Sequence, residues 1–240
     1  MNPDRDPIRI SKATLPVAFF FGALRPVLAA ALVLCILCQV ALASDWRVRV
    51  EKVLDGDTLV LEGGERLRLR GIDAPEVGHK GAPGQYYGQE AGKALSALVA
   101  GRVIRLDRDE LGRDRYGRLV GLARLGDGRL VNLAMIELGA AFVYPHPSDK
   151  DSGLAKTLHA AQVAAMDRGK GFWPGLMRSR DAVQPYVGNR NSKRFHVVSC
   201  PQGRTVKSAN QVRFSSLREA FAAGYAPARE CTPWPPERGR

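Results

Sequence analysis

Charged side chains gather in three short clusters in the first half of the sequence. The clusters are Asp55-Gly56-Asp57-Thr58, the stretch from Arg68 to Glu76, and Asp114-Arg115-Tyr116-Gly117-Arg118. Carboxylates are the hard oxygen ligands that a divalent cation prefers, and a carboxylate can also orient or deprotonate a water molecule. Arginines carry guanidinium forks that fit the oxygens of a phosphate group. Together, these residue types can carry out metal-assisted cleavage of a phosphodiester bond.

The apolar runs between the clusters predict the elements that position them. Residues 46–54 alternate polar and apolar side chains, residues 55–57 form a turn, and residues 58–62 are expected to form the returning strand. Gly63-Gly64 predicts a hairpin turn, and residues 66–72 alternate leucines with arginines. Further along, helices are expected at residues 89–99, 133–138 and 152–168, and strands at 102–107 and 119–125. Such short, closely spaced strands indicate a small closed antiparallel barrel.

In their order and spacing, the three clusters resemble the signature of the staphylococcal nuclease (thermonuclease) family. The matching patterns are Asp-Gly-Asp-Thr at 55–58, Arg-x-x-x-x-Asp-x-Pro-Glu at 68–76 and Asp-x-Tyr-Gly-Arg at 114–118. The resemblance runs from about Trp46 to Trp173 and implies a nuclease domain over residues 46–176. It also implies the fold class, a mixed α+β arrangement with a five-stranded OB-type barrel and three helices.

The resemblance implies a calcium site. Asp57 and Asp73 match the two metal carboxylates of the family, whereas Asp55 matches only a secondary position and suits a turn. Ala74 stands where the family often has threonine, and its backbone carbonyl can still bind the metal. Ca²⁺ accepts such a mixed shell of oxygen ligands and tolerates irregular geometry.

The resemblance also implies roles in catalysis. Glu76 matches the residue that positions or deprotonates the attacking water, and Arg68 and Arg118 match the two arginines that grip the phosphate. A lysine could not reproduce their bidentate fork. Arg115 and Tyr116 match positions that touch a flanking phosphate.

Two further residues have interpretations of their own. Tyr144 is a candidate for stacking on a base or, equally, for a place in the core. Asn132 stands at the start of a predicted helix, and a capping role is sufficient to explain it.

The implied activity is cleavage of DNA and RNA without sugar specificity, leaving 3′-phosphate ends. A site that grips phosphates should show slight base specificity, because phosphate contacts carry little sequence information. The expected enzyme is a monomer without a stable protein partner. The alternatives are a non-catalytic OB-fold protein that binds nucleic acid, and a secreted basic protein that associates with an envelope or polymer.

Composition agrees with a polyanionic partner. The chain has 240 residues, of which 45 % are hydrophobic, and its formal net charge is +12. That length gives room for one sizeable domain with additions, and the hydrophobic content is sufficient for a packed core. The positive surplus favours nucleic acid or an anionic membrane surface.

The first 43 residues are expected to be a signal peptide. Basic residues up to Arg25 precede an apolar run, and Ala41-Leu42-Ala43 fits the small-x-small cleavage pattern. Cleavage predicts a secreted or periplasmic protein, and an uncleaved leader would make it membrane-anchored. Cys35 and Cys38 lie in this leader, so cleavage leaves only Cys200 and Cys231.

The C-terminal part is expected to be a separate unit. Residues 184–191 have the composition of a linker, and residues 192–232 partly resemble the small zinc-binding module of the Ada DNA-repair protein. Ala228 stands where that module has the first cysteine of its last pair, so a zinc site would have only Cys200, Cys231 and His196. A disulfide between Cys200 and Cys231 is the alternative that an oxidising compartment favours.

Overall fold

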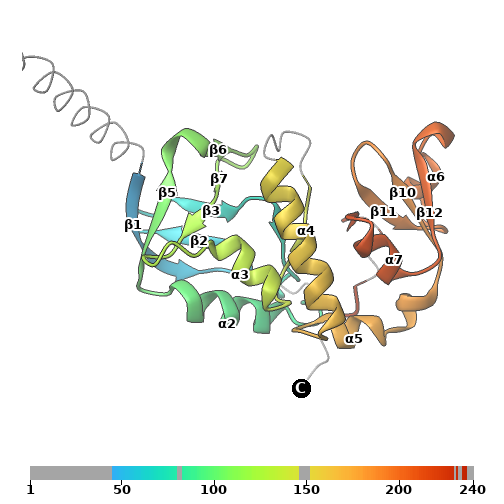
Figure 1. Ribbon diagram of the computed structural model, residues 1–240, viewed down its shortest axis with the longest axis horizontal. Coiled ribbons are helices and arrows are strands. Elements are labelled where there is room, and N and C mark those ends of the chain that lie inside the picture. The colour runs from blue at the N-terminus through green and yellow to red at the C-terminus, as the bar shows by residue number, and fades with distance from the viewer. Residues whose placement is uncertain (1–44, 80–82, 146–151, 230, 232–233, 237–240) are drawn as a thin grey trace, which may run out of the picture. The chain divides into compact units, whose positions relative to one another are not determined.

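A computed structural model describes residues 45–79, 83–145, 152–229, 231 and 234–236, and these form one compact unit (Figure 1). The predicted signal peptide lies outside the described residues. In the described part, no helix is both long enough and apolar enough to span a membrane.

A seven-stranded sheet forms the first half of this unit, in the order β6-β7-β3-β2-β1-β5-β8. The strands are β1 (Asp45–Val53), β2 (Thr58–Leu61), β3 (Arg66–Leu69), β5 (Val103–Asp107), β6 (Gly112–Arg113), β7 (Leu119–Gly121) and β8 (Ala123–Arg124). The sheet bends round because β7 and β8, at its two sides, are separated in sequence by Leu122 alone. The segment 119–124 therefore pairs with β3 through β7 and with β5 through β8, which is consistent with the expected OB-like fold.

Helices pack against this sheet and enclose its core. They are α2 (Gly88–Val99), α3 (Val131–Glu137) and α4 (Ser152–Asp167), followed by the short α5 (Trp173–Met177). A two-stranded sheet of β4 (Ile72–Asp73) and β9 (Phe142–Val143) joins the loop after β3 to the segment before α4. The core contains side chains that the alternating pattern turns inward, among them Val50, Leu59, Leu67 and Ile104. The fold is thus mixed α+β.

A second sheet follows, in the order β12-β10-β11-β13. Its strands are β10 (Tyr186–Asn189), β11 (Arg194–Val197), β12 (Gln211–Phe214) and β13 (Ala226–Pro227), and its helices are α6 (Pro201–Arg204) and α7 (Leu217–Ala222). Short 3-10 turns lie at η2 (Arg108–Glu110), η3 (Arg180–Val183) and η4 (Ser208–Asn210). Helix α4 contacts both α3 and α7, so it lies between the two sheets (Figure 1).

The predicted linker at 184–191 is part of the C-terminal sheet instead, because β10 occupies half of it and pairs with both β11 and β12. Gly188 in this strand permits close packing. A Cβ there would lie 2.8 Å from the rings of Phe214 and Tyr225. Glycine inside a strand often marks such an approach.

The two sheets also share an aromatic cluster. It joins Phe142, Phe172 and Trp173 to Phe221 and Trp234, with ring centroids 4.5–6.4 Å apart. The C-terminal elements therefore pack onto the first half of the unit through buried aromatic surface, which is a strong source of stability.

Candidate active site

Arg68 lies between two carboxylates at the centre of the site. It is 9 % exposed and forms ion pairs with Asp57, at 2.5 Å, and with Asp73. Strand pairing explains the arrangement. Thr58 on β2 pairs with Arg68 on β3, so Asp57, which directly precedes Thr58, lies next to the guanidinium of Arg68. Asp73 is the last residue of β4. The structure thus brings both predicted metal carboxylates to one point.

Asp57 is held firmly from both sides. Its Oδ2 accepts a hydrogen bond from the backbone N–H of Ala74 at 2.8 Å, and its Oδ1 accepts one from the hydroxyl of Thr58 at 2.8 Å. The preceding Gly56 permits this approach, since a Cβ there would lie 2.6 Å from the Cβ of Ala74 and 2.7 Å from that of Ala91. The turn at 55–57 is therefore packed against both the second cluster and helix α2.

Negative charge is crowded around Arg68. Burial raises the pKa of Asp55 to about 7, with a further contribution from Asp57. Burial also raises the pKa of Asp73 to about 7, although the charge of Arg68 opposes it. The pKa of Glu76 is raised too, first by partial burial of its carboxylate and then by the charge of Asp57. Four acidic side chains therefore surround one buried guanidinium, and a second cation bound there would stabilise their charged forms.

The donor set fits a hard cation. The carboxylate oxygens of Asp57 and Asp73 meet at the guanidinium of Arg68, and carboxylates are ligands that Ca²⁺ takes. Across the described ranges, no three His, Cys, Asp or Glu side chains gather closely enough to hold a metal by themselves. A cation at Asp57 and Asp73 would therefore need backbone or water oxygens as well, as the sequence predicts for Ala74.

The backbone of Glu76 is fixed by Gln85 and Gly88, while its side chain is exposed. The N–H of Glu76 donates to Oε1 of Gln85 at 2.9 Å, and the N–H of Gln85 donates to the carbonyl of Glu76 at 2.9 Å. Gly88, the first residue of α2, lies so close that a Cβ would be 2.3 Å from the carbonyl oxygen of Glu76. The carboxylate thus projects from a rigid backbone toward solvent.

Asp114 organises the turn that presents Arg118. It accepts hydrogen bonds from the backbone N–H groups of Tyr116 and Arg118, at 2.9 and 3.0 Å, and from Nε of Arg118 at 2.8 Å. Burial alone would raise the pKa of Asp114, but these hydrogen bonds outweigh it and lower the pKa. The sequence pattern at 114–118 includes Asp114 but implies no role for it. These contacts show that Asp114 positions Arg118.

The predicted phosphate-gripping residues share one cleft of about 660 Å³, here called the arginine cleft. Arginine and tyrosine side chains line it: Arg68, Arg70, Arg113, Arg115, Arg118, Arg229, Tyr116 and Tyr144. Tyr116 is 62 % exposed, and the Arg115 guanidinium carbon lies 4.9 Å from its ring centroid. Tyr144 is half-buried, and the guanidinium of Arg194 lies 3.4 Å from its ring centroid. One face of Tyr144 is therefore already covered.

A smaller hollow of about 190 Å³, here called the acidic hollow, lies beside the carboxylates. Asp73, Ala74 and Glu76 line one part of it, and Pro227, Ala228, Arg229 and Trp234 line another. Arg229 thus borders both spaces, and its charge acts to lower the pKa of Glu76, as that of Arg118 does. Sequence reasoning missed Arg229 and Arg194, since no motif marks them.

The predicted capping role of Asn132 is wrong. Helix α3 begins one residue earlier, with Leu130 as its N-cap, and Asn132 is fully buried. Its amide donates to the carbonyl of Arg70 at 2.9 Å, and its oxygen accepts from the N–H of Ala123 at 3.1 Å. Asn132 therefore ties the end of β3, which carries Arg68, to the start of β8, a short distance beyond Arg118.

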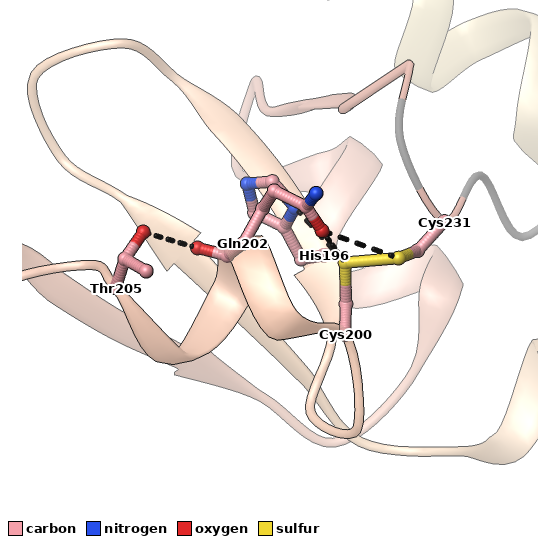
Figure 2. Close-up of a disulfide and its surroundings, with 5 residues drawn as sticks. All are labelled: His196, Cys200, Gln202, Thr205 and Cys231. Atoms are coloured by element: carbon pink, nitrogen blue, oxygen red, sulfur yellow. Dashed lines mark hydrogen bonds between the residues drawn. A yellow bond between two sulfur atoms is a disulfide. The ribbon is translucent and has the colours of Figure 1, made fainter.

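The structure joins Cys200 to Cys231 by a disulfide (Figure 2). Cys200 is 2 % exposed, and Nδ1 of His196 lies 3.8 Å from its sulfur. The two cysteines therefore serve as a covalent link here, and the three-ligand zinc site considered from the sequence would require that link to be broken.

Comparisons with known proteins agree with the clusters. A family model described as staphylococcal nuclease homologue matches residues 66–175. An uncharacterized endonuclease of Escherichia coli O157:H7 is 35 % identical over 65 % of this chain and 93 % of its own length. A thermonuclease of Staphylococcus intermedius is 34 % identical over 52 % of this chain and 74 % of its own. Endonuclease YhcR of Bacillus subtilis is 29 % identical over 73 % of this chain but only 16 % of its own.

The family match includes Arg68, Asp73, Glu76 and Arg118, and it ends before the C-terminal sheet begins. It does not extend to residues 192–232.

Proposed function

The chain belongs to the family of staphylococcal nuclease homologues, and from that premise we propose that it is a calcium-dependent endonuclease. It hydrolyses the phosphodiester bonds of both DNA and RNA and leaves 3′-phosphate ends. The observation that carries this proposal is the meeting of Asp57, Arg68 and Asp73 at one point, next to a cleft lined with arginines.

In this proposal Asp57, Asp73 and the carbonyl of Ala74 hold Ca²⁺. When bound, the cation neutralises charge on the scissile phosphate and lowers the pKa of a nearby water. The grouping of Asp57 and Asp73 at Arg68 supports the assignment. Burial is the main cause that raises the pKa of Asp55, Asp73 and Glu76, and the negative charge of Asp57 adds to it in each case.

Glu76 orients the attacking water and accepts its proton. Its raised pKa makes the carboxylate a stronger base, and its side chain lines the acidic hollow. The guanidinium groups of Arg68 and Arg118 bind the equatorial oxygens of the phosphate, where charge grows in the transition state. Arg115 and Tyr116 contact a flanking phosphate, and Tyr144, which lines the arginine cleft, contacts a base.

Export is part of the proposal. The leader at residues 1–43 directs the protein to the periplasm or the medium, where the Cys200–Cys231 disulfide is stable. The enzyme acts there as a monomer without a stable partner protein.

The test is digestion of single-stranded DNA and RNA with Ca²⁺ and with a chelator. We expect cleavage only with Ca²⁺, and products that a polymerase extends only after phosphatase treatment. Glu76→Gln and Arg118→Ala should each lower the turnover by about 10²- to 10⁴-fold. Glu137→Gln, an exposed glutamate on α3, is the matched control and should be unaffected.

The proposal is wrong if both site variants keep the wild-type turnover. Binding of nucleic acid without cleavage, at every Ca²⁺ concentration, would instead favour a non-catalytic OB-fold binding protein.

A further inference from the structure

Residues that follow the start of β13 form one wall of the candidate active site. Four residues that follow the start of β13, Pro227, Ala228, Arg229 and Trp234, line the acidic hollow together with Asp73 and Glu76. These residues lie well beyond the segment that the family model matches. Residues outside the segment that the family model matches therefore contribute to this site.

Arg229 is the chemically useful residue in this wall. It is exposed, and it lines the acidic hollow together with Asp73 and Glu76 and the arginine cleft together with Arg118. Its charge opposes the rise in the pKa of both carboxylates. Among the described residues, it makes no ion pair within 4.0 Å.

The backbone around Arg229 is anchored before and after it. On the near side, the N–H of Ala228 donates to the carbonyl of Phe195 at 2.9 Å. On the far side, Cys231 is joined to the buried Cys200 (Figure 2). Further on, Nε1 of Trp234 donates to the carbonyl of Tyr86 at 2.9 Å. A long cationic side chain on so constrained a backbone is pre-organised for a ligand.

The neighbouring arginines are already engaged. Arg68 is paired with two carboxylates, and Arg118 donates its Nε to Asp114. A polyanion that enters the arginine cleft therefore meets Arg229 as a guanidinium with no carboxylate partner among the described residues. Its planar fork suits a phosphate.

We propose that Arg229 binds a backbone phosphate of the nucleic acid adjacent to the scissile one, and that the Cys200–Cys231 disulfide holds it there. The inference rests on the proposed nuclease function. The C-terminal segment is then a substrate-binding arm of the active site.

The decisive variant is Arg229→Ala, with Arg213→Ala as its matched control. Arg213 is exposed on β12, lines neither the acidic hollow nor the arginine cleft, and its loss removes the same charge. With single-stranded DNA and Ca²⁺, Arg229→Ala should raise KM about 3- to 30-fold and leave kcat within about threefold. Arg229→Lys should recover part of the loss, and Arg213→Ala should change KM less than about twofold.

A second measurement is independent of cleavage. In a chelator, a short fluorescein-labelled single-stranded oligonucleotide should bind Arg229→Ala more weakly, and the slope of log K against log salt should be shallower by about 0.7. A protein that binds but never cleaves would refute the proposed function, while this measurement would still decide the role of Arg229.

The role of the disulfide is tested by a double-mutant cycle. The Cys200→Ser/Cys231→Ser variant should raise KM in the way that Arg229→Ala does, and combining the two changes should add little, because both remove the same contact. The thermal midpoint of each variant reports whether it folds. The inference fails if Arg229→Ala binds and cleaves like the wild type, if Arg213→Ala loses as much, or if the effects are additive.

Discussion

Replacing Gly88 with alanine should disable the enzyme without touching a charged residue. Gly88 opens helix α2 and packs against the loop that carries Glu76. A Cβ at this position would lie 2.3 Å from the carbonyl oxygen of Glu76, 2.8 Å from its carbonyl carbon and 3.2 Å from the nitrogen of Val77. All three are backbone atoms, so no side-chain rotation can relieve the contact.

The size of the effect follows from these distances. A carbon and an oxygen normally approach to about 3.3 Å, so the backbone of Glu76 must move by about 1 Å. A misplacement of about 1 Å costs a catalytic group about 10²-fold in rate. We therefore expect Gly88→Ala to lower kcat about 100-fold, and overpacking to lower the free energy of unfolding by about 1–3 kcal/mol.

Gly92→Ala is the control, because Gly92 lies one turn further along the same helix. A Cβ there would meet only backbone atoms of Asp55, at the ordinary distance of 3.8 Å. Alanine should stabilise the helix by up to about 1 kcal/mol and leave turnover unchanged. Initial rates of single-stranded DNA cleavage at 25 °C, with urea denaturation of each variant, give both quantities.

A folded Gly88→Ala variant with the wild-type kcat would refute this reasoning. It would mean either that Glu76 is not the catalytic carboxylate or that its loop moves freely. A loss of activity that Gly92→Ala shares would show instead that helix α2 tolerates no added volume.

Two further predictions concern residues that position the arginines. Asn132→Ala removes buried hydrogen bonds to Arg70 and Ala123, so it should lower the free energy of unfolding by about 2–4 kcal/mol, measured by urea denaturation, and reduce kcat/KM as well. Asp114→Ala releases the side chain of Arg118 on an exposed turn, so it should reduce kcat/KM about tenfold while the thermal midpoint stays within a few degrees.

Local pattern predicted the strands and helices around the first two clusters well. The strand expected at 46–54 is β1 at Asp45–Val53, and the helix expected at 89–99 is α2 at Gly88–Val99. Helix α7 has a cap of the same local kind, since the hydroxyl of Ser216 accepts a hydrogen bond from the N–H of Glu219. Such features depend on residues a few positions apart, which is why pattern alone finds them.

Contacts between distant residues account for what sequence reasoning missed. Asn132 has the composition of a helix cap, yet its partner Arg70 is 62 residues away and is met only when the sheet forms. The polar stretch 184–191 suggested a linker, but its strand is held by partners on both sides. Hydrogen bonds to remote partners leave no periodic pattern in the sequence, either around Asn132 or in residues 184–191.

The sequence clusters alone predicted that Asp57, Arg68 and Asp73 belong together, and the pairing of β2 with β3 and the turn after β4 do bring them to one point. Only the tertiary structure decided that Arg229 joins them. That residue reaches the acidic hollow because the C-terminal sheet packs through an aromatic cluster and its last segment is anchored at Cys231 and Trp234. Burial of apolar surface is non-directional, so it can bring together residues that no local pattern connects.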